Sequence, residues 1–392
     1  MGRRSMQSDR LKRLPPYLFV EIDRSKAEYV RSGREVLDLG IGDPDLGAPP
    51  ELVDTLRSSL DKIEYHRYPS DRGLPRLIEA IRGWALEQYG VKTGSDEILV
   101  TIGSKEAIGH LPLAVLNPGD AVLVPDPGYP VYSSSAVFAG ADPVRMPLNE
   151  KNGYFPKFDD LDPSDLQRAK LMYLNYPNNP TGATAGKEQF EDTISFCREN
   201  ALLLVNDAAY SEISYDGRQQ ALFPVAKDAG VEFIELFSFS KTFSITGWRI
   251  GFAIGSPGVI SALARLKANV DSGVFSAIQA AAASALEEGY TEITGRIIDI
   301  FRKRRDLLAG SLRRGGFLFK IPDATFYFWI KVPGGGSSID YCGKLLEETG
   351  IVATPGIGFG EYGEGYFRLS ITASDDTILK AGQKLEKLGT ST

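Results

Sequence analysis

The chain has 392 residues, of which 43% are hydrophobic, so it can bury a large core and divide into two domains of unequal size. Its 51 acidic and 44 basic residues give a net charge of -7, and the basic residues cluster only near the start, which argues against a nucleic-acid surface. No stretch approaches the roughly 20 apolar residues that a membrane span needs, and no apolar signal segment follows the basic N-terminus. The composition predicts a cytoplasmic protein with neither nucleic acid nor membrane as a partner.

Cysteine and histidine are too few and too scattered to predict a structural metal site or a disulfide framework. Cys197 and Cys342 are isolated and form no Cys-x-x-Cys pair, and His66 and His110 are the only histidines. Structural zinc sites use Cys and His at short, regular spacings, and disulfide frameworks belong to small, cysteine-rich domains. We therefore expect no metal.

The N-terminal segment predicts an arm followed by a short strand. A proline-containing stretch and a charged helix candidate extend to about residue 35. Residues 35–40 predict a strand that ends in Ile41-Gly42-Asp43-Pro44-Asp45, where the glycines indicate a turn or a close backbone approach.

The middle of the chain predicts a doubly wound α/β domain. Short apolar strands at residues 121–125, 170–175, 202–207 and 233–237 alternate with helical or turn-rich segments. Beyond roughly residue 290, a charged helix at 296–305 and strands at 317–332 and 365–371 predict a smaller mixed domain. Because ligands of open α/β sheets bind beyond the carboxyl ends of the strands, the polar residues that follow each strand are candidates for a site.

Two early segments of this domain carry candidate binding residues. Ser104 and Lys105 follow an expected strand at residues 97–100 and begin a helix, so their backbone amides could hold an anion, although an ordinary helix cap is the commoner use of such a turn. Asp126-Pro127-Gly128-Tyr129-Pro130 is a rigid turn that presents one aromatic ring. Tyr129 could stack on a planar cofactor or fill a gap in the packing.

The next two strands end in more specific patterns. In Asn175-Tyr176-Pro177-Asn178-Asn179-Pro180-Thr181-Gly182, two prolines and a glycine constrain the loop, and the Asn179 amide could donate to a phenolic oxygen or belong to a plain turn. Asp207 and Tyr210 lie three positions apart after the following strand. Asp207 could cap a helix; buried against a pyridine nitrogen, its carboxylate would keep that nitrogen protonated.

Lys241 follows the strand at 233–237, together with Ser238, Ser240 and, eight residues on, Arg249. Partial burial would disfavour the ammonium form and free the amine for Schiff-base chemistry. Ser238 and Arg249 could bind an anionic group beside it, the arginine through two parallel hydrogen bonds. For Ser-x-x-Lys alone, a surface lysine is the commoner reading.

Arg368 lies in the expected strand at 365–371, where its charge would need a partner, either a carboxylate ligand or an internal acid. Gly358-Phe359-Gly360-Glu361-Tyr362-Gly363 matches Gly-x-Gly-x-x-Gly, but a strand is expected after it instead of a helix. We therefore discount it as a dinucleotide-binding motif.

Taken together, these segments resemble the fold-type I pyridoxal-phosphate enzymes, specifically the class I/II aminotransferases. The resemblance covers nearly the whole chain and rests on Asn-Pro-Thr-Gly at 179–182, Asp-x-x-Tyr at 207–210, Ser-x-x-Lys at 238–241, Arg249 and Arg368, in the family's order. It implies an α/β fold with a large domain, in which helices sandwich a mainly parallel seven-stranded sheet, and a smaller α/β domain. The implied division is 1–49 for the arm and part of the small domain, 50–290 for the large domain and 291–392 for the C-terminal small domain.

The resemblance also implies roles for the candidate residues. Lys241 would hold pyridoxal 5'-phosphate covalently and move the proton during transamination, Asp207 would pair with the pyridinium, and Tyr210 and Asn179 would bond the phenolic oxygen. Cofactor-binding roles would further fall to Ser104, Lys105, Ser238, Ser240 and Arg249 at the phosphate and to Tyr129 at the ring. Gly42, Asn179 and Arg368 would bind the amino-acid or 2-oxo-acid substrate, with Arg368 on the α-carboxylate. Tyr68 matches a tyrosine that reaches the phosphate of a neighbouring subunit, which implies a homodimer with shared active sites.

Within the family, further segments resemble the LL-diaminopimelate aminotransferases, among them Leu14-Pro15-Pro16-Tyr17-Leu18-Phe19 and Gly103-Ser104-Lys105-Glu106. The implied reaction moves nitrogen between LL-diaminopimelate or tetrahydrodipicolinate and glutamate or 2-oxoglutarate, in lysine biosynthesis. Tyr17, Lys105 or Tyr132 could then bind the distal end of the substrate. Aminotransferases for aspartate, alanine or other amino acids share much of this pattern and remain alternatives.

Two other classes of protein use a similar chain. A carbon-sulfur lyase built on the same lysine would release ammonia and pyruvate instead of transferring nitrogen. A ligand-sensing relative fused to a DNA-binding module is the weakest alternative, because the full catalytic set is present and no helix-turn-helix segment is evident.

Overall fold

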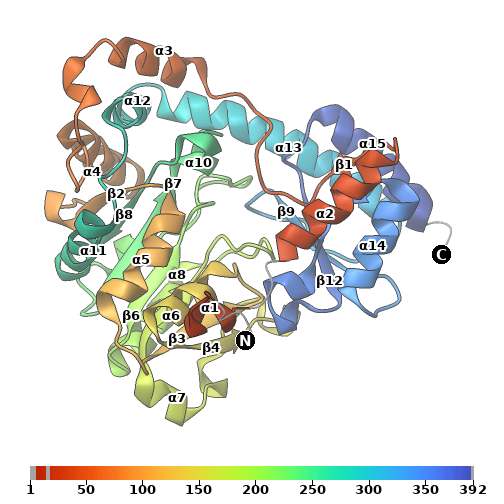
Figure 1. Ribbon diagram of the computed structural model, residues 1–392, viewed down its shortest axis with the longest axis horizontal. Helices are drawn as coiled ribbons and strands as arrows, with labels where there is room; N and C mark the ends of the chain where they lie inside the picture. Colours follow the sequence, from red (N-terminus) through yellow and green to blue (C-terminus); the bar gives the residue numbers. More distant parts are fainter. Residues whose placement is uncertain (1–5, 15–17, 390–392) are drawn as a thin grey trace.

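The structure is a computed structural model that describes residues 6–14 and 18–389. Its chain forms a large part around one sheet and a smaller part beside it, and the long helix α13 (Tyr290–Arg314) runs from one to the other (Figure 1). Within the described ranges, no helix has both the length and the apolar composition needed to cross a bilayer.

The large part is built on a seven-stranded sheet with strand order β2-β8-β7-β6-β5-β3-β4. The pairs from β4 to β7 are parallel, and β8 is antiparallel to both of its neighbours. The mainly parallel sheet expected from the sequence is therefore confirmed. Its strands are β2 (Ile98–Thr101), β3 (Ala121–Asp126), β4 (Asp142–Pro147), β5 (Ala169–Leu174), β6 (Leu203–Asp207), β7 (Phe233–Ser238) and β8 (Gly251–Gly255).

Helices cover both faces of this sheet because its central strands are apolar on both sides. In β5, Leu171 and Tyr173 belong to one buried cluster, while Met172 and Leu174 belong to the other. Successive side chains of a strand point to opposite faces, so this alternation builds two cores from one strand. The helices of the large part are α3 (Pro50–Ser59), α4 (Pro75–Tyr89), α5 (Ser104–Val115), α6 (Val131–Ala139), α7 (Pro163–Arg168), α8 (Lys187–Glu199), α9 (Phe223–Ala226), α10 (Phe239–Thr242), α11 (Pro257–Val270) and α12 (Ser276–Glu287).

The small part joins the two ends of the chain. β1 (Leu37–Asp38) pairs in parallel with β10 (Ile351–Val352), and β9 (Tyr327–Lys331), β11 (Thr354–Pro355) and β12 (Tyr366–Ser370) form an antiparallel sheet in the order β11-β12-β9. The helices that accompany these strands are α2 (Leu18–Arg31), α14 (Ser338–Thr349) and α15 (Asp375–Gly389), and a short α1 (Asp9–Lys12) precedes them. Figure 1 shows α2, α14 and α15 grouped around β9 and β12.

Two expected strands are shorter than the sequence suggested. Of residues 35–40, only Leu37 and Asp38 are in a strand, because the segment has one short partner, β10. Of residues 317–332, only Tyr327–Lys331 is a strand. Pro322, which has no amide hydrogen for a sheet ladder, interrupts the rest.

The expected helix at 296–305 is the middle of α13, which continues for 25 residues. At its start the Tyr290 ring packs against Trp84 of the large part, and at its end Arg314 pairs with Glu386 of α15. The division into 1–49, 50–290 and 291–392 stays a prediction, because α13 belongs to both parts.

Candidate active site

The carboxyl ends of β5, β6 and β7 border a pocket that segments of the small part complete. Residues from both parts line it, so the relative placement of the parts sets its geometry. The lining residues are Ile22, Gly40, Ile41, Gly42, Ser104, Lys105, Ile108, Tyr129, Tyr132, Asn175, Asn179, Asp207, Ala209, Tyr210, Ser238, Ser240, Lys241, Thr246, Arg249, Tyr327, Thr354 and Arg368.

Lys241 lies on α10, the single helical turn that follows β7. Its Nζ donates a hydrogen bond of 2.8 Å to the carbonyl oxygen of Gly42 and lies 5.6 Å from the centre of the Phe326 ring. Burial lowers the pKa of the amine to about 8, the nearby guanidinium groups of Arg249 and Arg368 act in the same direction, and the Asp43 carboxylate opposes them. A substantial share of Lys241 is thus neutral near pH 8 and able to act as a nucleophile or base.

Asp207 ends β6 and is 4% exposed. Its carboxylate accepts hydrogen bonds from the Tyr132 hydroxyl at 2.8 Å and from the Ala209 amide at 3.2 Å. Burial nevertheless raises the pKa of this carboxyl to about 6, because two donors do not replace its hydration. A cationic ring nitrogen in the pocket would supply the missing charge partner.

The loop after β5 is tied to the end of β6 by Asn175. The Asn175 side chain donates 2.6 Å to the carbonyl oxygen of Asp207 and accepts 2.9 Å from the Asn179 amide. This arrangement places Asn179 and Asp207 beside the same pocket.

Arg368 of β12 reaches the pocket from the small part and is 3% exposed. Its guanidinium donates 2.7 Å to the side-chain oxygen of Asn179 and 2.7 Å to the carbonyl oxygen of Gly40. It also lies 4.1 Å from the centre of the Tyr327 ring. A guanidinium at this position could bind a substrate carboxylate through charge-assisted hydrogen bonds.

Two tyrosine hydroxyls meet beside the lysine. Tyr210 and Tyr327 lie 3.0 Å apart, oxygen to oxygen. The Tyr327 hydroxyl also explains why residue 42 is a glycine, since a Cβ at this position would lie 2.0 Å from the hydroxyl oxygen. The pocket wall opposite Lys241 therefore requires glycine.

Several hydrogen-bond donors gather at the start of α5. Gly103 precedes the helix at φ 71°, and a Cβ there would lie 2.7 Å from Nη2 of Arg249. Ser238 is buried nearby in the pocket lining, and the buried Ser240 Oγ has no hydrogen-bond partner among the described residues. A phosphate fits these donors, because a helix N-terminus and an arginine both favour an anion.

Twelve of the thirteen candidate residues line this one pocket. They are Gly42, Ser104, Lys105, Tyr129, Asn179, Asp207, Tyr210, Ser238, Ser240, Lys241, Arg249 and Arg368. Tyr68 is not among the lining residues and is 90% exposed. The individual roles stay predictions.

The three residues considered for the distal end of a substrate differ in their exposure and in whether the structure describes them. Lys105 lines the pocket and is exposed. Tyr132 also lines the pocket, but it is only 1% exposed and its hydroxyl donates to Asp207, so it supports that carboxylate. Tyr17 lies outside the described residues.

Sequence reasoning missed the supporting residues of the site. Asn175 begins the loop motif at 175–182. Its position directly after an expected strand could have predicted a role at the site. The sequence around Tyr327 did not indicate a site residue, because it is an apolar run that also predicts core packing. Tyr132 was named only for a different role.

A buried ion-pair cluster lies behind the start of α5. Lys267 is 1% exposed, and its Nζ lies 3.0 Å from Glu106 and 2.7 Å from Asp271. Glu106, His110 and Asp271 bring potential metal-ligand atoms within 4.8 Å of one another. The Lys267 side chain pairs with Glu106 and Asp271, two of these three potential ligands, in place of a metal ion.

Comparison with known proteins gives full-length matches. A family model described as aminotransferase class I and II matches residues 34–385. The LL-diaminopimelate aminotransferase of Syntrophobacter fumaroxidans is 44% identical over 384 residues, 98% of this chain and 99% of that protein. Its counterpart from Natranaerobius thermophilus is 45% identical over 385 residues, 97% and 99% of the two chains. The solved structure of substrate-bound BacF from Bacillus subtilis matches with a TM-score of 0.92 at 35% identity, over 98% of each chain.

Proposed function

The chain belongs to the class I and II aminotransferases, and from that premise we propose that it transfers an amino group between LL-diaminopimelate or tetrahydrodipicolinate and glutamate or 2-oxoglutarate. It is a transaminase of the fold-type I class that works with pyridoxal 5'-phosphate. The single observation that carries the substrate is the full-length similarity to enzymes named for LL-diaminopimelate. Lysine biosynthesis is the setting in which this reaction is used.

The residues of the pocket fit the cofactor. The amine of Lys241, the buried carboxylate of Asp207 and the donors around Arg249 offer a covalent anchor, a partner for a ring nitrogen and a phosphate site in one cavity. When bound, pyridoxal 5'-phosphate withdraws electrons from Cα of the amino acid attached to it. Tyr210 and Asn179 are the proposed partners of its phenolic oxygen, and Tyr129 of its ring.

The protein's own part is orientation and proton transfer. Arg368 binds the α-carboxylate of the substrate and fixes its Cα in the pocket. Lys241, once its amine is free, would take the proton from that Cα at its Nζ and pass it on to the bound cofactor. Burial of the site excludes water from the amine, which keeps the neutral form accessible.

The distal end of diaminopimelate carries both an ammonium and a carboxylate, so it needs polar residues at the pocket mouth. Among the residues that the structure describes, Lys105 is the candidate for this role, because it is exposed and lines the pocket. Replacing Lys105 by Gln should then change the selectivity between diaminopimelate and glutamate. Unchanged selectivity would remove Lys105 from the proposal.

A homodimer with shared sites is a further part of the proposal, as is a cytoplasmic location. Tyr68 supports the dimer, because a 90% exposed tyrosine outside its own pocket is available to the pocket of a second chain. In such a dimer, the partner's Tyr68 would reach the phosphate site beside Arg249.

Adding amino acids one at a time to the holoenzyme tests the substrate. LL-diaminopimelate and glutamate should each change its visible absorbance, and 2-oxoglutarate should reverse the change. If diaminopimelate has no effect while aspartate or alanine does, the substrate assignment is wrong and the aminotransferase class stands.

A carbon-sulfur lyase is separated from a transferase by its products. Glutamate formed in equal amount with the oxo product supports nitrogen transfer. Release of ammonia and pyruvate would support the lyase instead.

A further inference from the structure

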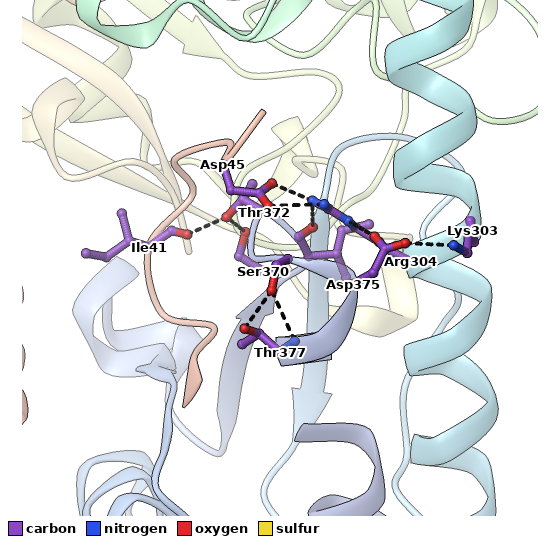
Figure 2. A network of polar contacts seen from close by, with 10 residues as sticks. Ile41, Asp45, Lys303, Arg304, Ser370, Thr372, Asp375 and Thr377 are labelled. Atoms are coloured by element: carbon purple, nitrogen blue, oxygen red, sulfur yellow. Dashed lines mark hydrogen bonds and ion pairs between the residues drawn. The ribbon is translucent and has the colours of Figure 1, made fainter. Parts of the chain in front are cut away.

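Residues 39–45 form a strap that crosses from the small part to the pocket. Its first half is bonded to the small part residue by residue: the Ser370 amide donates 2.7 Å to the Leu39 carbonyl oxygen, and the Thr354 hydroxyl donates 2.7 Å to that of Gly40. The Thr372 hydroxyl donates 2.8 Å to the carbonyl oxygen of Ile41 (Figure 2).

The far end of the strap is held by an ion pair with α13. Figure 2 shows Asp45 facing Arg304, whose two terminal nitrogens donate to the two carboxylate oxygens at 2.6 and 3.1 Å. Arg304 is 4% exposed, and its Nε donates 2.8 Å to Asp375. The Asp45 amide also donates 2.9 Å to the carbonyl oxygen of Thr372. A bidentate arginine pair fixes direction as well as distance, so this end of the strap has one orientation.

The middle of the strap contacts the large part through two hydrogen bonds. The Gly42 carbonyl oxygen accepts from Lys241 Nζ at 2.8 Å, and the Asp43 carboxylate accepts from the Thr246 hydroxyl at 2.7 Å. Both donors lie on the segment that follows β7. The position of the Gly42 oxygen opposite the lysine therefore depends on the anchors at Ile41 and Asp45.

We propose that Arg304, through its ion pair with Asp45, is a positioning residue that holds the Gly42 carbonyl oxygen where it orients the free amine of Lys241. Arg304 touches neither the lysine nor the pocket. It acts through the strap, and the Thr372 hydroxyl acts in the same way at Ile41. The inference rests on the proposed function only in taking Lys241 as the working amine.

The orientation has an electrostatic consequence. A carbonyl oxygen stabilises an ammonium more than an amine, so the contact with Gly42 favours protonated Lys241, as does the nearby Asp43 carboxylate. Arg249 and Arg368 act against them and do not belong to the strap. Loosening the strap should therefore lower the pKa of Lys241 below its value of about 8.

The test uses Asp45→Asn, which keeps the side-chain size and removes the charge that pairs with Arg304. The matched control is Lys303→Met, because Lys303 is exposed, neighbours Arg304 on α13 and also pairs with Asp375. The first readout needs no bound cofactor: competitive labelling of the cofactor-free protein with acetic anhydride across pH, with Lys241 acetylation followed by peptide mass spectrometry. We expect the Lys241 titration midpoint to fall by roughly half a pH unit or more in Asp45→Asn and to stay unchanged in Lys303→Met.

The second readout is the rate of transamination. A misplaced base lowers kcat, so we expect roughly a tenfold loss in Asp45→Asn, a raised isotope effect with Cα-deuterated substrate and a KM for the amino acid within about twofold of the unsubstituted enzyme. If Asp45→Asn has the same Lys241 titration midpoint and the same kcat as Lys303→Met, the proposal is overturned and Arg304 is a purely structural residue.

Two outcomes separate this inference from the proposed function. If the protein shows no transamination with any amino acid, the labelling midpoint still decides the role of Arg304. If Asp45→Asn does not fold, Thr372→Val removes the hydroxyl bonded to Ile41 while keeping the ion pair, and the same fall in midpoint is expected. An unchanged midpoint in folded Thr372→Val would then contradict the proposal.

Discussion

Burial acts on Lys241 and Asp207 in opposite directions, and both effects serve the same chemistry. It lowers the pKa of the amine to about 8 and raises that of the carboxyl to about 6. The lowered pKa of Lys241 makes its neutral amine available as a base. The raised pKa of Asp207 shows that its carboxylate lacks hydration, so a cationic partner stabilises it more than it would in water.

Lys241→Arg should separate the anchoring of the cofactor from proton transfer. The guanidinium stays charged at all working pH values, so it can neither take the proton from Cα nor form the covalent link. The donors around Arg249 remain, so we expect cofactor binding to persist by absorbance and a loss of kcat of at least 10²- to 10⁴-fold. Lys303→Arg, on the exposed face of α13, is the control and should keep full activity. Retention of more than about a tenth of the activity in Lys241→Arg would contradict the role.

Asp207→Asn should stabilise the cofactor-free protein at high pH while impairing the holoenzyme. The folded protein binds the Asp207 proton more tightly than the unfolded chain, since the pKa is about 6 instead of about 3.9. The free energy of unfolding therefore falls as pH rises from about 4 to about 6, and the full penalty is present above that range. Asparagine removes a penalty of about 2–3 kcal/mol at pH 8, and the gain should shrink toward zero near pH 4.

Urea unfolding of the two cofactor-free proteins at pH 8 and pH 5 measures this difference. A variant that is less stable than the unsubstituted protein at pH 8 would mean that the hydrogen bonds from Tyr132 and Ala209 to the carboxylate outweigh the cost of burial. Cofactor affinity should fall in either case, because the amide cannot pair with a pyridinium charge.

At the scale of elements, the strands were predictable wherever a short apolar run ended in polar residues. The expected strands at 121–125, 170–175, 202–207 and 233–237 match β3, β5, β6 and β7 to within one residue at each end. The candidate residues that follow these strands line one pocket for a related reason, since the carboxyl ends of parallel strands lie at one edge of the sheet.

What lies inside and between the elements was not predictable. Glu235 is in the middle of β7 with no exposed surface, where its carboxylate accepts from the amides of Leu222 and Phe223 and from the side chain of Asn206. Those partners lie on other elements, and nothing in the sequence says that they meet. The strap is a similar case: the glycines of 40–42 indicated a close approach, but the contacts with Tyr327, Lys241 and Arg304 join residues that lie far apart in the sequence.

Gly42→Ala tests the closeness of the strap to the pocket wall. The added Cβ would stand 2.0 Å from the Tyr327 oxygen, so either the strap or the tyrosine must move, and the Gly42 contact with Lys241 moves with it. We expect a loss of kcat of roughly 10- to 100-fold. Gly47→Ala is the matched control, because a Cβ at Gly47 meets nothing within 4 Å, and its stability should stay within about 0.5 kcal/mol. Equal kcat values for the two variants would show that the strap tolerates displacement.

At the scale of the whole molecule, the pocket is a junction of two parts and, in the proposed dimer, of two chains. Lys241, Asp207 and Arg249 come from the large part, while Gly42 and Arg368 come from the small part.

Exposed apolar side chains gather on neighbouring segments near Tyr68. Ile63 of η1 (Ile63–His66) is 75% exposed and Phe275, just before α12, is 38% exposed, and the His66 and Phe275 rings lie 6.0 Å apart. Tyr68 itself, 90% exposed, lies two residues after the end of η1. Exposed apolar groups gathered in this way are typical of a subunit interface.

Mixing two impaired variants tests whether the sites are shared. A chain with Lys241→Ala lacks the working amine, and a chain with Tyr68→Ala lacks the hydroxyl proposed to reach the phosphate of its neighbour. When the two are unfolded and refolded together, random pairing makes about half of the dimers mixed. In each mixed dimer one site carries both substitutions, and the other has its own Lys241 and the partner's Tyr68 intact.

About a quarter of all sites should therefore regain activity, although each variant alone is impaired. The recovered activity is measured against the two variants refolded separately and then combined, a control that keeps the same chains without mixed dimers. Activity no higher than that control would contradict shared sites, because a site made from one chain gains nothing from its neighbour. A quarter of the unsubstituted activity requires that Tyr68 serve the neighbouring chain, since a tyrosine acting within its own chain would leave every site of the mixed dimer with one defect.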